Sequence, residues 1–245
     1  MSVTDWNSRT ALLLGDVALE QLQNSHVLAA GAGGVGGIAI EMLVRAGVGE
    51  MTIIDGDRVD VTNRNRQLAA LISTVGEFKT DVWANRLRDI NPNLKLHLHN
   101  RYFTAEDMEH LLETSSFDCV LDAIDTVAPK TALLAACVRK NIPVVSCMGA
   151  GAKMDPEAVQ CADISKTIVC PLARVIRGNL KKLGITKGVH AVFSTEKAHE
   201  HAVIPSDDCG PGKKSITGTI SFMPNLFGCH CAAAVLRLLT ETNLD

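Results

Sequence analysis

Short apolar runs alternate with longer, more polar segments along the first 146 residues of the chain. The runs HVLAAG, MTIID, FDCVLDAID and IPVVSC are typical of buried strands, and LKLHLH alternates like a strand with one exposed face. Helix-like segments separate these runs, at about 16–23, 36–46, 76–90, 104–113 and 129–140. This alternation predicts a Rossmann-like, doubly wound α/β fold with a mainly parallel sheet.

The pattern is less regular after residue 146. AVQCADI and HAVFST are predicted strands, CPLARVIRGNLKKLG between them is a predicted helix, and residues 225–239 are a last apolar helix that should pack on the sheet. Residues 196–214 are polar and rich in Gly and Pro, which favours a long, mobile crossover loop at the surface. We expect residues 1–245 to form one domain, with a Rossmann-like part at about 1–146 and a C-terminal part at about 147–245.

Composition and charge narrow the class of protein. Hydrophobic residues make up 47% of the chain, yet no apolar run is long enough to cross a bilayer without a charge or a Gly or Pro break. The first residues lack the features of a signal peptide, so we expect a soluble cytoplasmic protein with no membrane partner. The eight cysteines lie mostly in apolar runs, which favours buried reduced thiols. The net charge of -3 argues against a strongly basic nucleic-acid binder, although it allows a local basic patch.

A glycine-rich turn between the first strand and the next helix predicts a nucleotide site. Gly31, Gly33 and Gly36 fit the pattern G-x-G-x-x-G, and with Gly34 they allow the backbone to approach phosphates at a helix N-terminus. Asp55 ends the next strand, where its carboxylate can accept hydrogen bonds from ribose hydroxyls. Dehydrogenases and some ATP-using enzymes share these features, and a tight structural turn would also explain the glycines alone.

Polar residues downstream favour ATP over a dinucleotide. The chain continues with two amides and two cations, which suit a triphosphate better than a pyrophosphate: Asn63, Gln67, Arg66 and Lys79. Asp122 and Asp125 then lie at the carboxyl end of a predicted strand, at the sheet edge where α/β folds bind ligands, and a carboxylate there can hold Mg²⁺ beside phosphates. Taken singly, Arg66 or Lys79 would be a solvated surface charge. The prediction of ATP therefore depends on all of these polar residues occurring together in this order along the chain.

The motifs GAGGVGG, IDGDRVDVTNRNRQ, VGEFKTD, INP and DAIDT, in this order, resemble the ubiquitin-activating-enzyme superfamily of adenylating enzymes, which includes ThiF, MoeB and HesA. The resemblance implies that a carboxylate attacks the α-phosphate of ATP and gives an acyl-adenylate and pyrophosphate. It implies these roles: ribose binding by Asp55, phosphate binding by Asn63, Arg66 and Lys79, and Mg²⁺ binding by Asp125.

The roles of Asp57 and Asp122 remain open, whereas the role of Arg9 implies a dimer. Asp57 and Asp122 are either ligand contacts or structural residues of the loops. Arg9, in SRTALLLG, matches the superfamily arginine that reaches into the active site of the neighbouring subunit, so the resemblance implies a homodimer in which Arg9 is catalytic.

The chain lacks the zinc-binding pairs that accompany activation of ubiquitin-like proteins in this superfamily. It contains no C-x-x-C, so no zinc is expected. Cys161 and Cys170 lie too far apart for a zinc knuckle, and the CHC segment at 229–231 fits a core helix. His199, His201 and Cys209 could bind a metal, although a mobile loop is the preferred interpretation.

A basic segment takes the place of the zinc subdomain. Residues 163–188 carry no acidic residue after the first, and Arg174, Arg177 and Lys181 share a helix face with Lys182 beside it. We interpret these four as contacts to a phosphate backbone rather than as a solvated helix face, which normally mixes both signs of charge.

With VFSTE and GTISFMPNLFG, this segment makes the chain similar to the tRNA threonylcarbamoyladenosine dehydratase branch of the superfamily. The resemblance implies Mg²⁺ and ATP as cofactors, a tRNA carrying threonylcarbamoyladenosine as substrate, and net loss of water by cyclisation. It also implies a monovalent cation, K⁺ or Na⁺, and a cysteine desulfurase or sulfur-acceptor system as partner. The alternatives are an adenylyltransferase for the C-terminal glycine of a ubiquitin-like sulfur carrier, a nicotinamide-dependent dehydrogenase and a non-catalytic nucleotide-binding partner.

Overall fold

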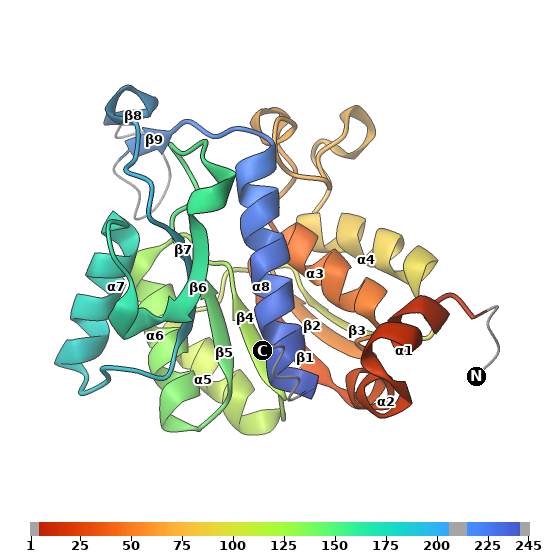
Figure 1. Ribbon diagram of the computed structural model, residues 1–245. Coiled ribbons are helices and arrows are strands. Elements are labelled where there is room, and N and C mark those ends of the chain that lie inside the picture. The colour runs from red at the N-terminus through yellow and green to blue at the C-terminus, as the bar shows by residue number, and fades with distance from the viewer. Residues whose placement is uncertain (1–4, 206–214, 241–245) are drawn as a thin grey trace.

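The computed structural model describes residues 5–205 and 215–240, which form a seven-stranded sheet with helices on both faces (Figure 1). The sheet order is β3-β2-β1-β4-β5-β7-β6, with all neighbours parallel except the pair β6 and β7. The strands are β1 His26–Ala30, β2 Glu50–Ile54, β3 Lys95–His99, β4 Cys119–Asp122, β5 Val144–Cys147, β6 Val159–Asp163 and β7 His190–Ser194. The predicted doubly wound, mainly parallel fold is confirmed.

The helices agree with the predicted segments within a few residues, apart from one that was not predicted. They are α1 Ser8–Leu14, α2 Asp16–Asn24, α3 Gly36–Ala46, α4 Lys79–Ile90, α5 Ala105–Thr114, α6 Val127–Arg139, α7 Pro171–Lys182 and α8 Phe222–Thr240. Short 3₁₀ turns lie at Val61–Asn63, Ile72–Thr74, Pro156–Ala158, Ile164–Lys166 and Glu200–Ala202. The predicted capping box before α5 is present: the Thr104 hydroxyl accepts from the backbone N–H of Asp107, whose carboxylate accepts from the backbone N–H of Thr104.

One helix was not predicted and another starts later than predicted, each for a local reason. The unpredicted α1 buries only Ala11, so its apolar residues form no core-facing stripe that a sequence pattern could reveal. Helix α4 begins at Lys79 instead of Gly76, because the backbone N–H groups of Gly76 and Lys79 donate to the carbonyls of Val59 and Asp57. That pairing, with the bridge between Arg58 and Phe78 and the positive φ of Gly76, keeps residues 76–78 out of the helix.

Two hydrophobic cores lie on the two faces of the sheet. Successive residues of a strand point to opposite faces of the sheet, so they enter different cores. Val27 of β1 lies in the core formed with α2, α3, α4 and α8, whereas Leu28 lies in the core formed with α5, α6 and α7. Full burial of such a side chain stabilises the fold by about 1.5–3 kcal/mol. The central strands are therefore mostly apolar, as a sheet covered on both faces requires.

The predicted mobile loop at 196–214 is wrong in part. Its described residues include the 3₁₀ turn Glu200–Ala202 and a strand, β8 Val203–Pro205, which pairs antiparallel with β9 Ser215–Thr217. The β-branched residues in these two short strands are the physical reason for the pairing, and they were obscured by the polar, Gly-rich residues around them. Residues 206–214 lie outside the described residues.

Helix α8 has the length and composition of a membrane span, with a mean hydropathy of 1.3. It lies along the front of the sheet in Figure 1, and Phe227, Cys231 and Val235 are fully buried there. A Cβ on Gly228 would approach Ile38 of α3 to 1.9 Å, so this glycine allows the two helices to cross closely. The contacts are those of the core helix of a globular domain, which passes the same length test.

Candidate nucleotide-binding site

The candidate site lies where the direction of strand order reverses. Strands β1 and β4 are neighbours, but the chain continues from β1 to β2 on one side and from β4 to β5 on the other. This reversal opens a crevice beyond the carboxyl ends of the strands, which is the common ligand-binding position in open α/β sheets. Gly31 follows β1 there, Asp55 follows β2 and Asp125 lies beyond β4.

The glycine turn has no room for side chains at its two ends. Gly31 has φ +94°, and a Cβ there would lie 2.8 Å from the Ala123 carbonyl oxygen. A Cβ on Gly36 would lie 1.9 Å from the Gly31 carbonyl oxygen. Helix α3 starts in this turn without a side-chain cap, so its first N–H groups and its dipole favour a bound anion such as phosphate.

Asp55 joins the glycine turn to the end of β2. Its two carboxylate oxygens accept hydrogen bonds from the backbone N–H of Ala32 at 2.7 Å and of Asp57 at 2.8 Å. Burial raises the pKa of Asp55, while the nearby Lys79 charge and these two hydrogen bonds oppose that rise. A carboxylate retains acceptor capacity beyond two hydrogen bonds, so Asp55 can also accept from a ribose hydroxyl.

A buried lysine begins α4 beside Asp57. Lys79 is only 4% exposed, and its Nζ lies 2.6 Å from Asp57 Oδ2. The hydroxyl of Tyr102 donates to the other oxygen of Asp57, and this hydrogen bond raises the pKa of Tyr102 to about 12. Asp57 thus contacts both Lys79 and Tyr102. Tyr102 was not predicted, although the sequence offers a signal, since it is the single tyrosine and follows the third strand of the fold.

The segment after β2 brings the remaining polar candidates to the glycine turn. Arg66 donates from Nη1 to the Thr62 carbonyl at 3.0 Å, and burial lowers its pKa against the opposing effect of the Asp125 carboxylate. Gln67 is 9% exposed, with its amide beside Gly33.

Asn63 lies in the same segment but has a local partner. Its Oδ1 accepts from the backbone N–H of Asp60 at 3.2 Å, as part of a capping box, so its amide first organises the loop. Gly34 lies between this loop and α8, since a Cβ there would be 3.1 Å from Pro224 and 3.6 Å from Arg66.

Of the two aspartates at the carboxyl end of β4, Asp122, which ends the strand, is structural. It is fully buried, 2.7 Å from the Nζ of the equally buried Lys130, and accepts from the Ser146 hydroxyl at 2.6 Å. Lys130 also donates to the Ile124 carbonyl at 3.0 Å, so the pair fixes the turn that presents the exposed Asp125. Lys130 was missed, and its signal is a lone lysine within the apolar helical sequence APKTALLAAC.

Arg9 lies away from the glycine turn of the same chain. It is exposed on α1, which packs beside α2 at the lower right of Figure 1, whereas the N-terminus of α8, next to Gly34, lies at the top. The four basic residues of α7 also differ among themselves. Arg174, Lys181 and Lys182 are exposed, whereas Arg177 is half-buried and donates to the Thr167 carbonyl at 2.8 Å.

The other metal candidates from the sequence are only partly described. The Nε2 atom of His199 lies 3.2 Å from a carboxylate oxygen of Glu196, and the ring centroids of His199 and His201 are 5.7 Å apart. Cys209 lies outside the described residues. In the segment at 229–231, Cys231 is buried in the core as predicted, whereas Cys229 is exposed. The described cysteines are free thiols, and most are buried.

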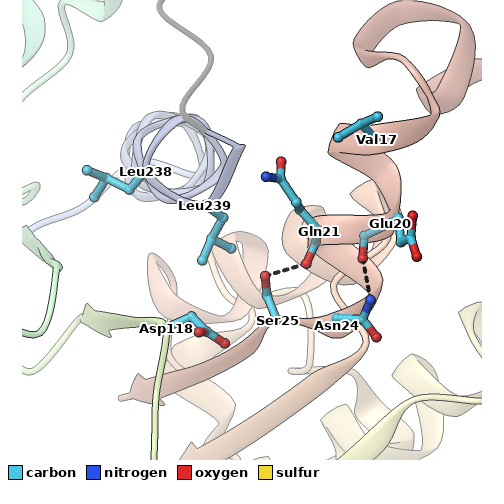
Figure 2. Close-up of a pocket in the computed structure, with 8 residues that line it drawn as sticks. All are labelled: Val17, Glu20, Gln21, Asn24, Ser25, Asp118, Leu238 and Leu239. Carbon is cyan, nitrogen blue, oxygen red and sulfur yellow. Dashed lines mark hydrogen bonds between the residues drawn. The ribbon is translucent and has the colours of Figure 1, made fainter.

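A separate pocket of about 510 Å³ lies away from the candidate site (Figure 2). Figure 2 shows it between α2 and the end of α8. Gln21, Ser25 and Leu239 line it, together with Asp118, the residue before β4. Ser25 and Asp118 directly precede β1 and β4, so the pocket lies at the amino ends of these strands, and none of the nucleotide-site candidates lines it.

Comparisons with known proteins agree with this geometry. The ThiF family matches residues 7–245. The chain is 46% identical over 189 residues to the tRNA threonylcarbamoyladenosine dehydratase of Bacillus subtilis (strain 168), covering 77% of this chain and 74% of that protein. It is 42% identical over 201 residues to the Escherichia coli (strain K12) protein of that name, covering 78% and 75%. It also matches the crystal structure of the E. coli dehydratase TcdA in complex with ATP, with a TM-score of 0.87 and 36% identity over 98% of each chain.

Proposed function

The chain belongs to the ThiF family, and on that premise we propose that it is an ATP-dependent tRNA threonylcarbamoyladenosine dehydratase. It adenylates the carboxylate of threonylcarbamoyladenosine next to the anticodon and cyclises the side chain. The observation that carries the proposal is the match to the ATP-bound dehydratase, because it spans both the nucleotide half and the half that carries α7. Residues 1–245 act as one ThiF-like domain in this proposal.

The polar groups around the glycine turn suit ATP. The start of α3 binds phosphate through backbone N–H groups, Asp55 binds the ribose, and Arg66 and Lys79 bind phosphate oxygens with help from Asn63 and Gln67. Lys79 exchanges its partner Asp57 for phosphate when ATP arrives. The exposed Asp125 carboxylate, beside the Thr126 hydroxyl, offers the oxygen ligands that Mg²⁺ prefers, and bound Mg²⁺ neutralises phosphate charge.

The reaction has two chemical steps. A carboxylate oxygen of the substrate attacks the α-phosphorus of ATP, and the bond to pyrophosphate breaks. A nitrogen of the same side chain then attacks the activated carbonyl and loses its proton, and AMP leaves with the former carboxylate oxygen, so the nucleoside loses one water. Arg66 and Lys79 stabilise negative charge at the phosphates, and ring closure is favoured because both reacting groups belong to one molecule.

The tRNA lies along α7 in this proposal. Arg174, Lys181 and Lys182 contact the phosphate backbone, while Arg177 supports the helix through Thr167. The N-terminal end of α7 lies at the same sheet edge as the nucleotide site, because the Cys170 sulfur lies 3.7 Å from where a Cβ on Gly149 would be. A tRNA on α7 can therefore extend its modified nucleoside towards ATP.

The active unit is a homodimer. Helices α1 and α2 carry apolar side chains that are largely exposed: Leu12 at 81%, Leu13 at 83% and Val17 at 74%. Ile72, in the segment after β2, is 78% exposed. Apolar surface of this kind favours an interface between subunits. Arg9 lies on the same short helix as Leu12 and Leu13, so docking of α1 on a partner can deliver Arg9 to the partner's phosphates. The proposal also includes a monovalent cation, a cytoplasmic location and a cysteine desulfurase system as partner.

Exchange of labelled pyrophosphate into ATP tests the proposed adenylation. Because the first step is reversible, exchange should depend on tRNA that carries threonylcarbamoyladenosine and be absent with the same tRNA lacking that modification. Asp125→Ala should abolish the exchange and keep the fold. Exchange that requires a ubiquitin-like carrier protein and ignores tRNA would contradict the proposal and support a carrier adenylyltransferase.

A further inference from the structure

Three side chains with metal-binding chemistry meet at the amino end of the sheet, opposite the nucleotide site. His26 begins β1, Glu50 begins β2 and His97 lies on the edge strand β3. The strand register pairs His26 with Glu50 and Thr52 with His97. Side chains alternate along a strand and partners in register point to the same face, so all three lie on one face of the sheet.

The three groups have the spacing of metal ligands. Glu50 Oε1 lies 2.9 Å from His97 Nε2 and 3.6 Å from His26 Nδ1, and the candidate ligand atoms of the cluster all lie within 4.8 Å of one another. Ligand atoms around a tetrahedral Zn²⁺ with bonds of about 2.0–2.1 Å lie roughly 3.3–3.4 Å apart. These two distances lie on either side of that value, and the third pair of ligand atoms lies within 4.8 Å, so side-chain shifts can bring all three to metal-ligand spacing.

Neighbouring groups orient His26 for this role. Its Nε2 lies 2.9 Å from the Thr52 hydroxyl, and its ring packs 4.6 Å from the ring of Phe117. In the tautomer that carries its proton on Nε2, the lone pair of Nδ1 faces the Glu50 carboxylate, an arrangement that a cation between them would stabilise. Histidine ligands are commonly held in this way, with the second ring nitrogen hydrogen-bonded.

The charges around the cluster also suit a cation. The Glu50 carboxylate contacts both histidine rings. A second carboxylate, that of Asp118, accepts from the backbone N–H of His26 at 2.7 Å and adds negative charge beside the cluster.

A dissolved ion can reach the cluster. The side chains of His26, Glu50 and His97 are 17%, 26% and 53% exposed. Lys95 lies 3.7 Å from the second oxygen of Glu50, but its side chain is 76% exposed, and such a surface pair is weak. Solvent access also leaves room for a water molecule as a fourth ligand.

We propose that His26, Glu50 and His97 bind a divalent transition-metal ion of the zinc class, which links β1, β2 and β3 at a site remote from the nucleotide. Two imidazoles and one carboxylate suit Zn²⁺, Ni²⁺ or Co²⁺, whereas Mg²⁺ prefers oxygen ligands. The absence of C-x-x-C pairs argues only against a zinc knuckle built from cysteines, and not against a site built from histidines and a carboxylate. This site is assembled from residues 24 and 47 positions apart along the chain, a spacing that no short sequence motif contains.

Zinc binding to the full-length, chelator-treated protein tests the site directly. Zn²⁺ is titrated against a coloured zinc indicator, and the thermal midpoint is measured with and without Zn²⁺. A ligand at 100 times its Kd should raise the midpoint of a chain of this size by roughly 5 °C. His97→Ala and Glu50→Gln should each weaken Zn²⁺ affinity by about tenfold or more and remove the midpoint shift.

His201→Ala is the matched control, because His201 is an exposed histidine from the other group that could bind a metal. It should bind Zn²⁺ as the unaltered protein does, and Mg²⁺ should cause no shift that depends on His97. Circular dichroism and ATP binding report whether each variant is folded. Unchanged Zn²⁺ affinity in a folded His97→Ala variant, or loss of binding in His201→Ala alone, would overturn the proposal.

Discussion

At the residue scale, Gly36 shows how backbone packing dictates one amino acid. A methyl group there would collide with the Gly31 carbonyl at 1.9 Å, so Gly36→Ala must displace the glycine turn. We expect Gly36→Ala to lower the free energy of unfolding by about 2 kcal/mol or more and to abolish ATP binding.

Gly178→Ala is the matched control for that variant. Gly178 lies within α7 and a Cβ there would meet nothing within 4 Å. The change should stabilise the helix by about 0.5–1 kcal/mol and leave ATP binding intact. Urea unfolding and calorimetric ATP titration measure both quantities, and normal ATP binding by Gly36→Ala would refute the turn's role.

Lys130 and Asp122 form a fully buried ion pair, so loss of one partner leaves an uncompensated charge. Lys130→Met should lower the free energy of unfolding by about 3–5 kcal/mol in urea denaturation. Lys140→Met removes the lysine of a partly exposed pair with Glu113 and should cost less than about 1 kcal/mol. Equal effects of the two changes would contradict a structural role for the buried pair.

Tyr102 is the single tyrosine, so the ultraviolet absorbance of tyrosinate reports one group. Its hydrogen bond to Asp57 raises its pKa to about 12, and Asp57→Asn should move the titration midpoint towards the ordinary value of about 10. Because the folded pKa is the higher one, the stability from this bond is present below about pH 10 and is lost between about pH 10 and 12.

The titration needs a check on folding and a matched change of charge. Circular dichroism must show that the protein remains folded over the measured range. Glu109→Gln removes an exposed carboxylate of α5 and should leave the midpoint where it is. A midpoint near 10 in the folded, unaltered protein would show that Tyr102 does not donate to Asp57.

At the scale of elements, α7 carries the prediction about tRNA. Arg174→Glu combined with Lys181→Glu should weaken tRNA binding and reduce the slope of log affinity against log salt by about 2, because phosphate contacts release counterions. ATP binding should be unchanged. Arg88→Glu with Arg139→Glu makes the same change of charge on exposed positions of α4 and α6 and should affect tRNA affinity much less. Equal losses in both pairs would indicate only a general effect of net charge.

The sequence was informative about elements wherever a periodic apolar pattern recorded burial. The central strands and α3 were predicted closely because their residues are buried on both sides. Helix α1 was missed because Leu12 and Leu13 point away from the core of their own chain. The pairing of β8 with β9 was missed because two strands of three residues leave too short a pattern to stand out from the polar residues between them.

The site was predictable to the extent that its residues follow one another in motifs. Gly31, Asp55 and Lys79 could be chosen as candidates because each occupies a fixed place beside a strand or helix. Lys130 and Tyr102 were not, since their roles depend on partners that only the fold brings close. The cluster of His26, Glu50 and His97 belongs to the same class, because strand register and not chain spacing assembles it.

At the scale of the whole molecule, the exposed apolar side chains of α1 predict that two copies complete each other's sites. Arg9→Ala and Asp125→Ala should each be inactive alone. Mixing them in equal amounts under subunit exchange should restore about a quarter of normal activity, since half of the dimers then contain one intact site of two. A mixture that stays inactive although size-exclusion chromatography shows mixed dimers would remove Arg9 from the neighbouring site.

The most direct test of the proposed function is mass spectrometry of nucleosides from tRNA that carries threonylcarbamoyladenosine, after incubation with the purified protein, Mg²⁺ and ATP. The account predicts that this nucleoside loses the mass of one water only when ATP is present, with AMP and pyrophosphate formed in equal amounts. Asp125→Ala should leave the nucleoside unchanged. An unchanged nucleoside, with protein shown to bind both ATP and the modified tRNA, would contradict the account.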